Sequence, residues 1–493
     1  MATITVSVSD ALGASDTAQI DVVATSVATR NVFQQPFGVN SIWNMPIGKG
    51  TGALGAAGTG PHGGSLMKYA GNDGPVYESA RISGVGNISA DENLILLGPS
   101  SPMKVVNNNN VDWSGGASAR CAATQTPTAK QIPVPSNAQY PGGTTTNPCT
   151  SPAVLGSTPN SCAAVLMPDR RTLYQTQPMQ ICGLGGPVTT HFGFADVDIF
   201  ADETTATKSA GGSHGGSAMS AFGGSIRWND IIPGNCPWLP GVADVMRHAV
   251  SMSLNGPVLS AFGAGPFWPA PHADAGHEGL LLALLPTFNI NSLLSTPGKS
   301  LAWTAMNYGI YVVDNSGWDA VNFSPEYSYG DASVNCPTGR VSCQFKTVWG
   351  VNFEGSNTSS NWARDVVTIL QNLYVITNNS LSSIGGGGPS RLQPLAAAPV
   401  DQGNITQAPV VVPASMFISH VGLQAGTLIG QVTASNSPYQ WSLSGTGASN
   451  FWVEPATGRI YATGAVTAGT YALTATATNI VGTDTDTVTI NVT

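Results

Sequence analysis

The chain has 493 residues, only 9% of them are charged, and its formal net charge at pH 7 is −9. A chain of this length is expected to fold into two or more domains, one of them large. The acidic balance and the lack of a basic cluster argue against nucleic-acid binding, because a phosphate backbone would be repelled. No run of about 18 apolar residues occurs, so no membrane span is expected.

Glycine is abundant, with 58 residues, and Ser, Thr and Asn take much of the place that Lys and Glu usually fill. This composition is typical of β-rich extracellular proteins, whose strands favour Val, Thr and aromatic residues and whose turns favour Gly and Asn. No signal peptide is visible after Met1. We therefore expect an extracellular or cell-surface protein, and we expect this chain to be part of a longer multidomain polypeptide.

The chain contains seven cysteines, and their spacing matches no zinc-ribbon or zinc-finger pattern. Disulfides are the favoured interpretation, given the other extracellular features. Cys336 and Cys343 would close a small loop, and Cys149 and Cys162 would constrain a segment rich in Thr, Pro and Ser. The odd count leaves one thiol unpaired.

The first predicted element is a β-hairpin within residues 1–26. Residues 3–8 and 17–23 alternate apolar and polar side chains, which is the period of two of a half-buried strand. Residues 471–478 and 484–492 repeat this layout around a turn of the Asn-x-x-Gly type. The hairpin therefore reads as the remnant of a preceding Ig-like module.

Residues 27–384 are predicted to form the central domain and candidate catalytic domain, in which short apolar runs alternate with Gly, Asn and Pro. We expect helices over 242–252, 297–308 and 361–374, and a strand over 308–314. The predicted fold class is therefore mainly β: a large sandwich-like or jelly-roll-like domain with a few short helices, with a barrel as the alternative.

Residues 385–408 are predicted to be a linker, because they are rich in Gly, Ala and Pro and have no periodicity. Residues 409–493 follow as a second β-rich domain. Its segments Trp441–Gly445, Thr457–Ile460 and Gly469–Tyr471 resemble the Ig-like and cadherin-like modules of bacterial surface proteins. That resemblance and the strand spacing imply a C-terminal β-sandwich.

Three phrases of the central domain are also distinctive: SIWNMPIG at 41–48, HGGSAMSAFGGSIR at 214–227 and NYGIYVVDNSGWDA at 307–320. They resemble a group of uncharacterised secreted proteins from soil bacteria. The resemblance implies one secreted domain of this extent, and it implies no mechanism and no catalytic residues.

Titratable residues gather between His191 and Pro286, among glycines and tryptophans. Within this stretch Asp274 and Glu278 are candidate catalytic carboxylates, because glycosidic hydrolysis needs one protonated and one ionised carboxyl group. Asp196 or Asp198 is the alternative partner. Trp268 and the leucines after Glu278 would raise the pKa of one carboxyl group by desolvation.

A second set of residues suits β-elimination, which needs a base and a cation that holds developing negative charge. His214 or His248 would serve as the base, and Arg227 or Arg247 as the cation. Ser213 lies in a Gly-x-Ser-x-Gly sequence, but the strand and helix that a nucleophile elbow requires are not evident around it.

No cofactor is required by either reaction, but a structural Ca²⁺ or another divalent metal is a further expectation. His272, Asp274 and His277 offer imidazole and carboxylate ligands. Asp198, which shares a strand face with Asp196, offers oxygen ligands for Ca²⁺.

Flat aromatic side chains stack on sugar rings, so Trp228 and Trp268, which lie nearest to the candidate polar residues, are the predicted substrate-binding tryptophans. His272 and Asn44 are placed with them. The leading hypothesis is a secreted polysaccharide-degrading enzyme, with a glycoside hydrolase slightly favoured over a polysaccharide lyase. The alternative is a non-catalytic cell-surface adhesin or structural glycan-binding protein, which would bind glycans without cleaving them.

Overall fold

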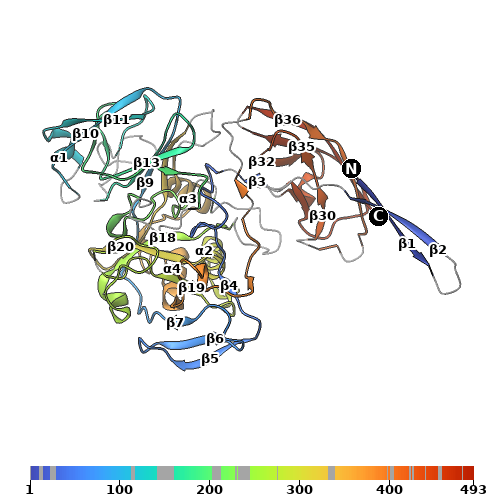
Figure 1. The fold of residues 1–493 in the computed structure, drawn as a ribbon, viewed down its shortest axis with the longest axis horizontal. Coiled ribbons are helices and arrows are strands. Elements are labelled where there is room, and N and C mark those ends of the chain that lie inside the picture. The colour runs from blue at the N-terminus through green and yellow to red at the C-terminus, as the bar shows by residue number, and fades with distance from the viewer. Residues whose placement is uncertain are drawn as a thin grey trace. The chain divides into compact units, whose positions relative to one another are not determined.

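The computed structural model describes the chain except for residues 1, 10–14, 23–28, 31, 113–116, 141–159, 203–211, 228–229, 231–244, 275, 331–338, 397, 400–404, 421–422, 425–426, 439, 454–457 and 480. The chain divides into two compact units, Arg30–Thr406 and a smaller unit formed by Met1–Thr29 with Gln407–Thr493. Both are built mainly from β-strands, as the composition predicts (Figure 1). Within the described residues, no helix is long and apolar enough to cross a membrane.

The centre of the larger unit is a ten-stranded mixed sheet. Its strands lie in the order β24 (Gly355–Ser356), β8 (Asn87–Ala90), β21 (Ala320–Phe323), β18 (Val250–Asn255), β20 (Ile310–Ser316), β19 (Leu281–Leu284), β25 (Leu373–Ile376), β7 (Tyr77–Ser79), β6 (Ser65–Tyr69) and β5 (Leu54–Thr59). Parallel pairing joins β18 to β20 and β8 to β21.

Two further sheets belong to the same unit. One has the order β16 (Phe192–Gly193), β13 (Thr172–Gln177), β12 (Ala163–Leu166), β9 (Asn93–Leu97), β22 (Glu326–Gly330) and β23 (Gly339–Arg340), with β17 (Val197–Asp198) also paired to β13. The other has the order β11 (Thr126–Pro133), β10 (Met103–Asn108), β15 (Val188–Thr190) and β14 (Gln180–Ile181). The short strands β4 (Gly48–Lys49) and β26 (Ser390–Arg391) pair with each other, and β3 (Thr29–Arg30) and β27 (Ala398–Pro399) complete the set.

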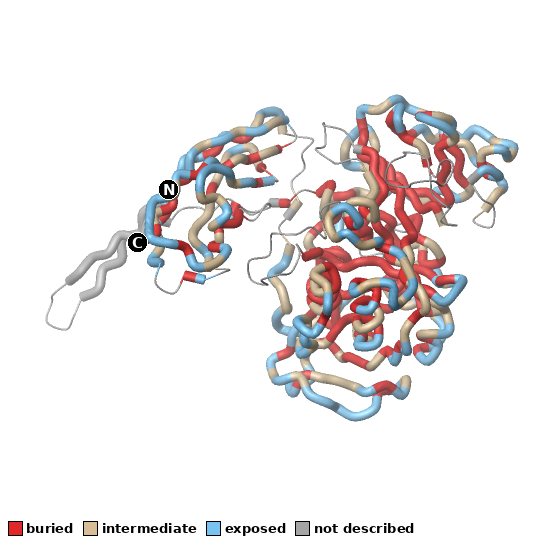
Figure 2. The backbone as a smooth tube through the Cα atoms, turned by 180° about the vertical axis from the view of Figure 1, so that it is seen from behind, coloured by how far each residue is buried: buried red, intermediate tan, exposed pale blue. Residues whose placement is uncertain are grey.

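The sheets pack on one another in layers, and alternate side chains of a strand belong to the cores on its two faces. In β20, Val312 belongs to the core on the helical side of the ten-stranded sheet, whereas Tyr311 belongs to the core on its other face. Ile95 of β9 joins that second core, whereas Leu96 faces a third core shared with the four-stranded sheet. Because neighbouring residues of a strand point to opposite faces, the central strands of the ten-stranded and seven-stranded sheets, such as β19, β9 and β12, are buried on both sides. The red segments at the centre of the larger unit in Figure 2 show this burial.

In the described part of the chain, four α-helices accompany the sheets: α1 (Ala117–Ala122), α2 (Thr296–Asn307), α3 (Val341–Trp349) and α4 (Asn361–Gln371). The 3₁₀ turns are η2 (Gly215–Ser217), η3 (Gly256–Phe262), η4 (Ile290–Ser292), η5 (Ile384–Gly386) and η7 (Ala448–Asn450). The helices expected over 297–308 and 361–374 are confirmed as α2 and α4, and the strand expected over 308–314 is confirmed as β20. Apolar residues of α2 and α4 pack on the ten-stranded sheet.

The helix expected over 242–252 is wrong for its described part, in which strand β18 begins at Val250. Val250 packs in the helical-side core and Ala249 in the core on the opposite face. A fully buried strand is apolar on both faces, so its sequence loses the period of two and can imitate a helix.

One disulfide, Cys121–Cys182, is present in the larger unit, with its Cα atoms 5.7 Å apart. Cys343 is also disulfide-bonded. The suggested bridge between Cys149 and Cys162 is wrong, because Cys162 is a free and buried cysteine. Cys149 lies outside the described residues.

The smaller unit contains a β-sandwich. One sheet has the order β29 (Ala414–Ile418), β36 (Thr483–Val492), β35 (Gly469–Thr478) and β32 (Gln440–Ser444), the other has β30 (Leu428–Gln431), β34 (Arg459–Ala462) and β33 (Phe451–Val453), and β28 (Val411–Val412) pairs with β31 (Thr433–Ala434). Trp441 and Ile460 pack in its core. The N-terminal strands β1 (Ala2–Ser9) and β2 (Ser15–Val22) form an antiparallel hairpin.

The beginning of the stretch that we expected to be a linker is folded onto the larger unit. Gly385 and Gly386 are buried, and Arg391 of β26 donates a hydrogen bond to the carbonyl of Pro46 at 3.1 Å. Four consecutive glycines from Gly385 to Gly388 have positive φ angles, which glycine adopts at little cost. The glycine run therefore makes a specific turn.

Candidate functional site

A cavity of about 1120 Å³ opens in the larger unit. It is lined by residues of β8, β18, β20 and β21 from the ten-stranded sheet and of β13 and β16 from the seven-stranded sheet, together with η2 and the loop that contains Pro271, His272 and Asp274. Its size suits a site for a ligand of several sugar rings or a similar molecule. We call this cavity the cleft.

Asp314, near the end of β20, is the most unusual titratable residue of the cleft. The pairing of β20 with β18 shifts in register between Met252 and Ser253, so that Val312 and Asp314 become successive partners. A β-bulge of this kind bends the strand and re-aims a side chain. The bulge ends the regular alternation of β20 at the point where its acidic residue reaches the cleft.

The carboxyl group of Asp314 accepts hydrogen bonds from the backbone N–H groups of Gly216 at 2.9 Å and Asn315 at 2.8 Å, and from Asn160 Nδ2 at 2.6 Å. Burial is the largest influence and raises the pKa of Asp314 to about 7, with a further contribution from the negative charge of Asp91. Asp314 therefore carries a proton in much of the population near neutral pH.

Asn160 connects Asp314 to a second acidic residue. Its Nδ2 also donates to Asp91 Oδ2 at 3.0 Å. Asp91 follows β8, is 6% exposed and lines the same cleft. One amide nitrogen thus holds two carboxyl groups close together, which is the arrangement that keeps one of a pair of acids protonated.

Two glycines of η2 allow the acidic side chains to approach. A Cβ atom added to Gly215, whose φ is +38°, would lie 1.9 Å from Asp314 Oδ2. A Cβ atom added to Gly216 would lie 3.0 Å from Asp274 Oδ2. The Gly215–Gly216 backbone therefore lies so close to Asp314 and Asp274 that it leaves no room for side chains at these two positions.

His272 and Asp274 are on the other side of this glycine pair. His272 Nδ1 lies 2.7 Å from the carbonyl oxygen of Gly216 and 3.3 Å from Asp274 Oδ1. Their side chains are 62% and 52% exposed. The sequence-predicted Asp274 and His272 are therefore both accessible from the cleft, and Gly216 connects them to Asp314 through its N–H and its C=O.

Exposed aromatic rings also line the cleft. Trp318 is 51% exposed and Phe192 is 41% exposed. Exposed apolar surface within a cavity often marks a ligand-binding site. Ring faces of this kind stack on the apolar faces of sugars.

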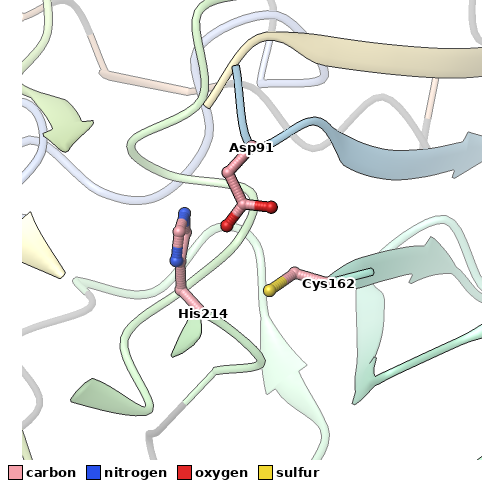
Figure 3. A group of neighbouring side chains, drawn as sticks. All are labelled: Asp91, Cys162 and His214. Carbon is pink, nitrogen blue, oxygen red and sulfur yellow. The ribbon is translucent and has the colours of Figure 1, made fainter. Parts of the chain in front are cut away.

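Asp91 also belongs to a buried group with Cys162 and His214, which adjoins the cleft (Figure 3). One ligand atom from each residue lies within 4.8 Å of the others. His214 Nε2 lies 2.7 Å from Ser324 Oγ, and burial lowers the pKa of His214 to about 3. Burial and the charge of Asp91 raise the pKa of the Cys162 thiol. The imidazole is therefore neutral, and the thiol keeps its proton.

Two of the catalytic residues predicted from sequence are instead buried and held by hydrogen bonds outside the cleft. Glu278 is fully buried and accepts hydrogen bonds from the N–H groups of Gly276 at 2.9 Å and His277 at 3.0 Å. His248 is buried between Asp230, 3.1 Å from its Nε2, and the carbonyl of Ala249. Neither Glu278 nor His248 lines the cleft.

Arg227, the predicted cation, is 1% exposed and forms an ion pair with Glu326 at 2.8 Å. Asn44 is fully buried, and its Nδ2 donates to the carbonyl oxygens of Pro36 and Gly38. Neither residue lines the cleft. Their buried ion pair and hydrogen bonds give both residues a role in stabilising the fold.

The remaining predicted residues are dispersed. Asp196 forms an ion pair with Lys130 at 2.7 Å, and Asp198 forms one with Arg171 at 2.5 Å. His277 is 1% exposed. The structure does not bring His272, His277 and Asp198 together as a metal site, because within the described part of the chain the group that could hold a metal is Asp91, Cys162 and His214.

Of the two predicted substrate-binding tryptophans, Trp268 packs partly buried against the core shared by the two large sheets. Trp228 lies outside the described residues. Among the described residues, Trp318 contributes an exposed indole to the cleft.

Sequence reasoning missed Asp91, Asn160, Cys162 and Asp314. A signal existed for Asp314, because this acidic residue directly follows the apolar run Ile310–Val313. An acidic residue is rarely buried unless it is paired, so an acidic residue at the end of a buried strand is a candidate functional-site residue. Asp91 similarly stands just before the apolar run of β9.

No family model matches the chain, and no curated protein is similar to it. Among solved structures, the crystal structure of Drosophila N-cadherin EC1-4 is similar at 18% sequence identity with a TM-score of 0.16, over 22% of this chain and 28% of that chain. The chain thus spans less than a third of the length of that cadherin structure.

Proposed function

We propose that the larger unit is a glycoside hydrolase that cleaves an extracellular polysaccharide in the cleft, with Asp314 as the general acid and Asp274 as the second carboxylate. The observation that carries this proposal is the placement of a buried carboxyl group and a solvent-exposed carboxylate on either side of Gly215 and Gly216. Glycosidic hydrolysis needs this pair, one protonated and one ionised, flanking the scissile bond.

The surroundings of the two carboxyl groups favour different roles. Asp314 is enclosed and close to the charge of Asp91, which favours its protonated form near neutral pH, so it can give a proton to the leaving oxygen. Asp274 is half exposed and lies beside the imidazole of His272. It can therefore act on the opposite face of the sugar, either directly or through water.

The remaining features of the cleft suit a neutral sugar chain. Trp318 and Phe192 offer two exposed rings for stacking. The Cys121–Cys182 disulfide is typical of proteins from an oxidising, extracellular compartment. The lyase alternative has less support, because both candidate bases, His214 and His248, are buried. Of its two candidate cations, Arg227 is buried and Arg247 does not line the cleft.

Hydrolysis is tested with a panel of plant, algal and bacterial glycans, scored for new reducing ends and for the absorbance of unsaturated products. We expect reducing ends without unsaturated products. Asp314→Asn and Asp274→Asn should each lower kcat about 10²–10⁴-fold, as is usual for the loss of a general acid or base. Asp73→Asn, at an exposed turn where the carboxylate accepts from Thr51, is the matched control and should keep full activity.

Trp318→Ala should raise KM roughly tenfold, with a smaller effect on kcat, because it removes a stacking surface and no proton-transfer group. Unsaturated products would instead indicate a lyase. Binding of a glycan by the unaltered chain, with no cleavage across the panel, would establish the adhesin alternative and overturn the proposed reaction.

A further inference from the structure

The group formed by Asp91, Cys162 and His214 has a composition that the proposed hydrolysis does not use. A thiol, an imidazole and a carboxyl group come from three separate parts of the chain: the loop after β8, the residue before β12 and the residue before η2. All three are buried, and one ligand atom of each lies within 4.8 Å of the others. Figure 3 shows the three side chains around a common space.

His214 supplies a separate observation. The imidazole is fully buried, and its Nδ1 atom has no hydrogen-bond partner among the residues that the structure describes. Its other nitrogen, Nε2, is held by Ser324 Oγ at 2.7 Å. A buried polar atom without a partner is costly unless something binds it, and metal-bound imidazoles commonly have their second nitrogen held in this way.

We propose that Asp91, Cys162 and His214 bind a zinc ion through one carboxylate oxygen, the Cys162 sulfur and His214 Nδ1. Zinc accepts this mixture of sulfur, nitrogen and oxygen ligands, with bonds of about 2.0–2.3 Å. Calcium and magnesium prefer oxygen ligands alone. On binding, the Cys162 thiol loses its proton to solvent and the sulfur becomes a thiolate ligand.

The proposed zinc ion would be reachable from the cleft. Asp91 lines the cleft, whereas Cys162 and His214 lie behind it. Three protein ligands leave one tetrahedral position open, as in catalytic zinc sites. The open position would take water or a substrate oxygen. Zn²⁺ held by the Asp91 carboxylate and the Cys162 thiolate carries no net charge, so its binding would cancel the negative charge of Asp91 that acts on Asp314.

The proposal is tested first with the unaltered full-length chain. After removal of bound metal with a chelator, the chain is titrated with Zn²⁺ and, separately, with Co²⁺. We expect one ion per chain, and we expect the Co²⁺ form to show the near-ultraviolet charge-transfer absorption of a thiolate ligand. Mg²⁺ should not compete. Failure of the unaltered chain to bind one Zn²⁺ would overturn the proposal.

The ligands are then tested by substitution. Cys162→Ser should abolish the charge-transfer absorption and weaken Zn²⁺ binding at least 100-fold, and Asp91→Asn should weaken binding but keep the absorption. Cys162→Ala provides a second variant in case the serine hydroxyl disturbs the buried position, and circular dichroism checks that each variant is folded. Charge-transfer absorption that persists in folded Cys162→Ser or Cys162→Ala would assign the thiolate elsewhere and overturn the site.

Asp274→Asn is the matched control, because it removes a carboxylate that lines the same cleft but lies outside the group of three. This variant should bind Zn²⁺ like the unaltered chain. Zinc binding is measured without any glycan, so a glycan panel that gave no products would leave the zinc result unchanged, and the two proposals can fail separately.

Discussion

At the scale of single residues, we expect Asp314 to make the cleft sensitive to pH near neutrality. Its carboxyl group is enclosed by Asn160, by the N–H groups of Gly216 and Asn315, and by the nearby charge of Asp91. Burial, with a further contribution from the charge of Asp91, raises the pKa of Asp314 to about 7. The folded state therefore binds a proton at Asp314 that the unfolded chain has already released above about pH 4.

This difference predicts how stability changes with pH. Between about pH 4 and pH 7 the folded state holds more protons at this site, so the contribution of Asp314 to the free energy of unfolding falls as pH rises. Asp314→Asn should remove most of that fall, which amounts to a few kcal/mol at most. Urea unfolding at several pH values, with a chelator present, measures it.

The half-exposed Asp274 provides the comparison for this experiment. Asp274→Asn should leave most of the pH dependence in place, because its side chain is 52% exposed and solvent screens its interactions. If the free energy of unfolding changed with pH equally in Asp314→Asn and in the unaltered chain, the buried carboxyl group would not be the source of the pH dependence.

At the scale of elements, the start of α2 is attached to α4 by one buried side chain. Asp365 of α4 accepts hydrogen bonds from the backbone N–H groups of Leu294 and Ser295, at 2.8 and 2.6 Å, and from Ser295 Oγ. Ser295 is also the N-cap of α2, where its hydroxyl accepts from the N–H of Gly298. Asp365 is 1% exposed, so its loss removes a buried acceptor and leaves three partly buried donors without this partner.

We expect Asp365→Ala to lower the free energy of unfolding by about 2–4 kcal/mol, because the charged hydrogen bonds and a buried acceptor are lost together. Ser360→Ala, which removes only the N-cap bond to Ala363 of α4, should cost about 1 kcal/mol. Urea denaturation of the two variants measures the difference. Equal losses would mean that Asp365 acts as an ordinary cap and not as a link between two helices.

At the scale of the whole molecule, the chain contains separate hydrophobic cores. The sandwich of the smaller unit has its own core, which includes Trp441, whereas three cores lie between the layers of the larger unit. Units with separate cores unfold as separate cooperative transitions. We therefore expect two transitions in calorimetry.

Substitution in one core should then move one transition. Trp441→Ala should lower the free energy of unfolding of the smaller unit by about 3–5 kcal/mol. The melting temperature of one transition should therefore fall, and that of the other should stay unchanged. Trp362→Ala, in the core shared by the helices and the ten-stranded sheet, should move the other transition. A single transition shifted by both variants would contradict this division.

Much of the local structure could be predicted from sequence because it depends on neighbouring residues. Ser295 and Pro297 mark the start of α2, apolar spacing marks α4, and period-two alternation marks the hairpin strands β35 and β36. His272 and Asp274 can also be singled out from the sequence as candidate site residues, because imidazole and carboxylate groups are conspicuous among prolines and alanines in a chain with few charges.

Tertiary structure alone decided the rest of the site. Asp91, Asn160, Cys162, His214 and Asp314 come from distant positions, and no spacing in the sequence relates them. They meet because parallel pairing brings strand ends to one cleft, and because the bulge in β20 re-aims Asp314. Burial then raises the pKa of Asp314 and leaves His214 Nδ1 without a partner, and burial is a property of the packed layers that no single strand carries.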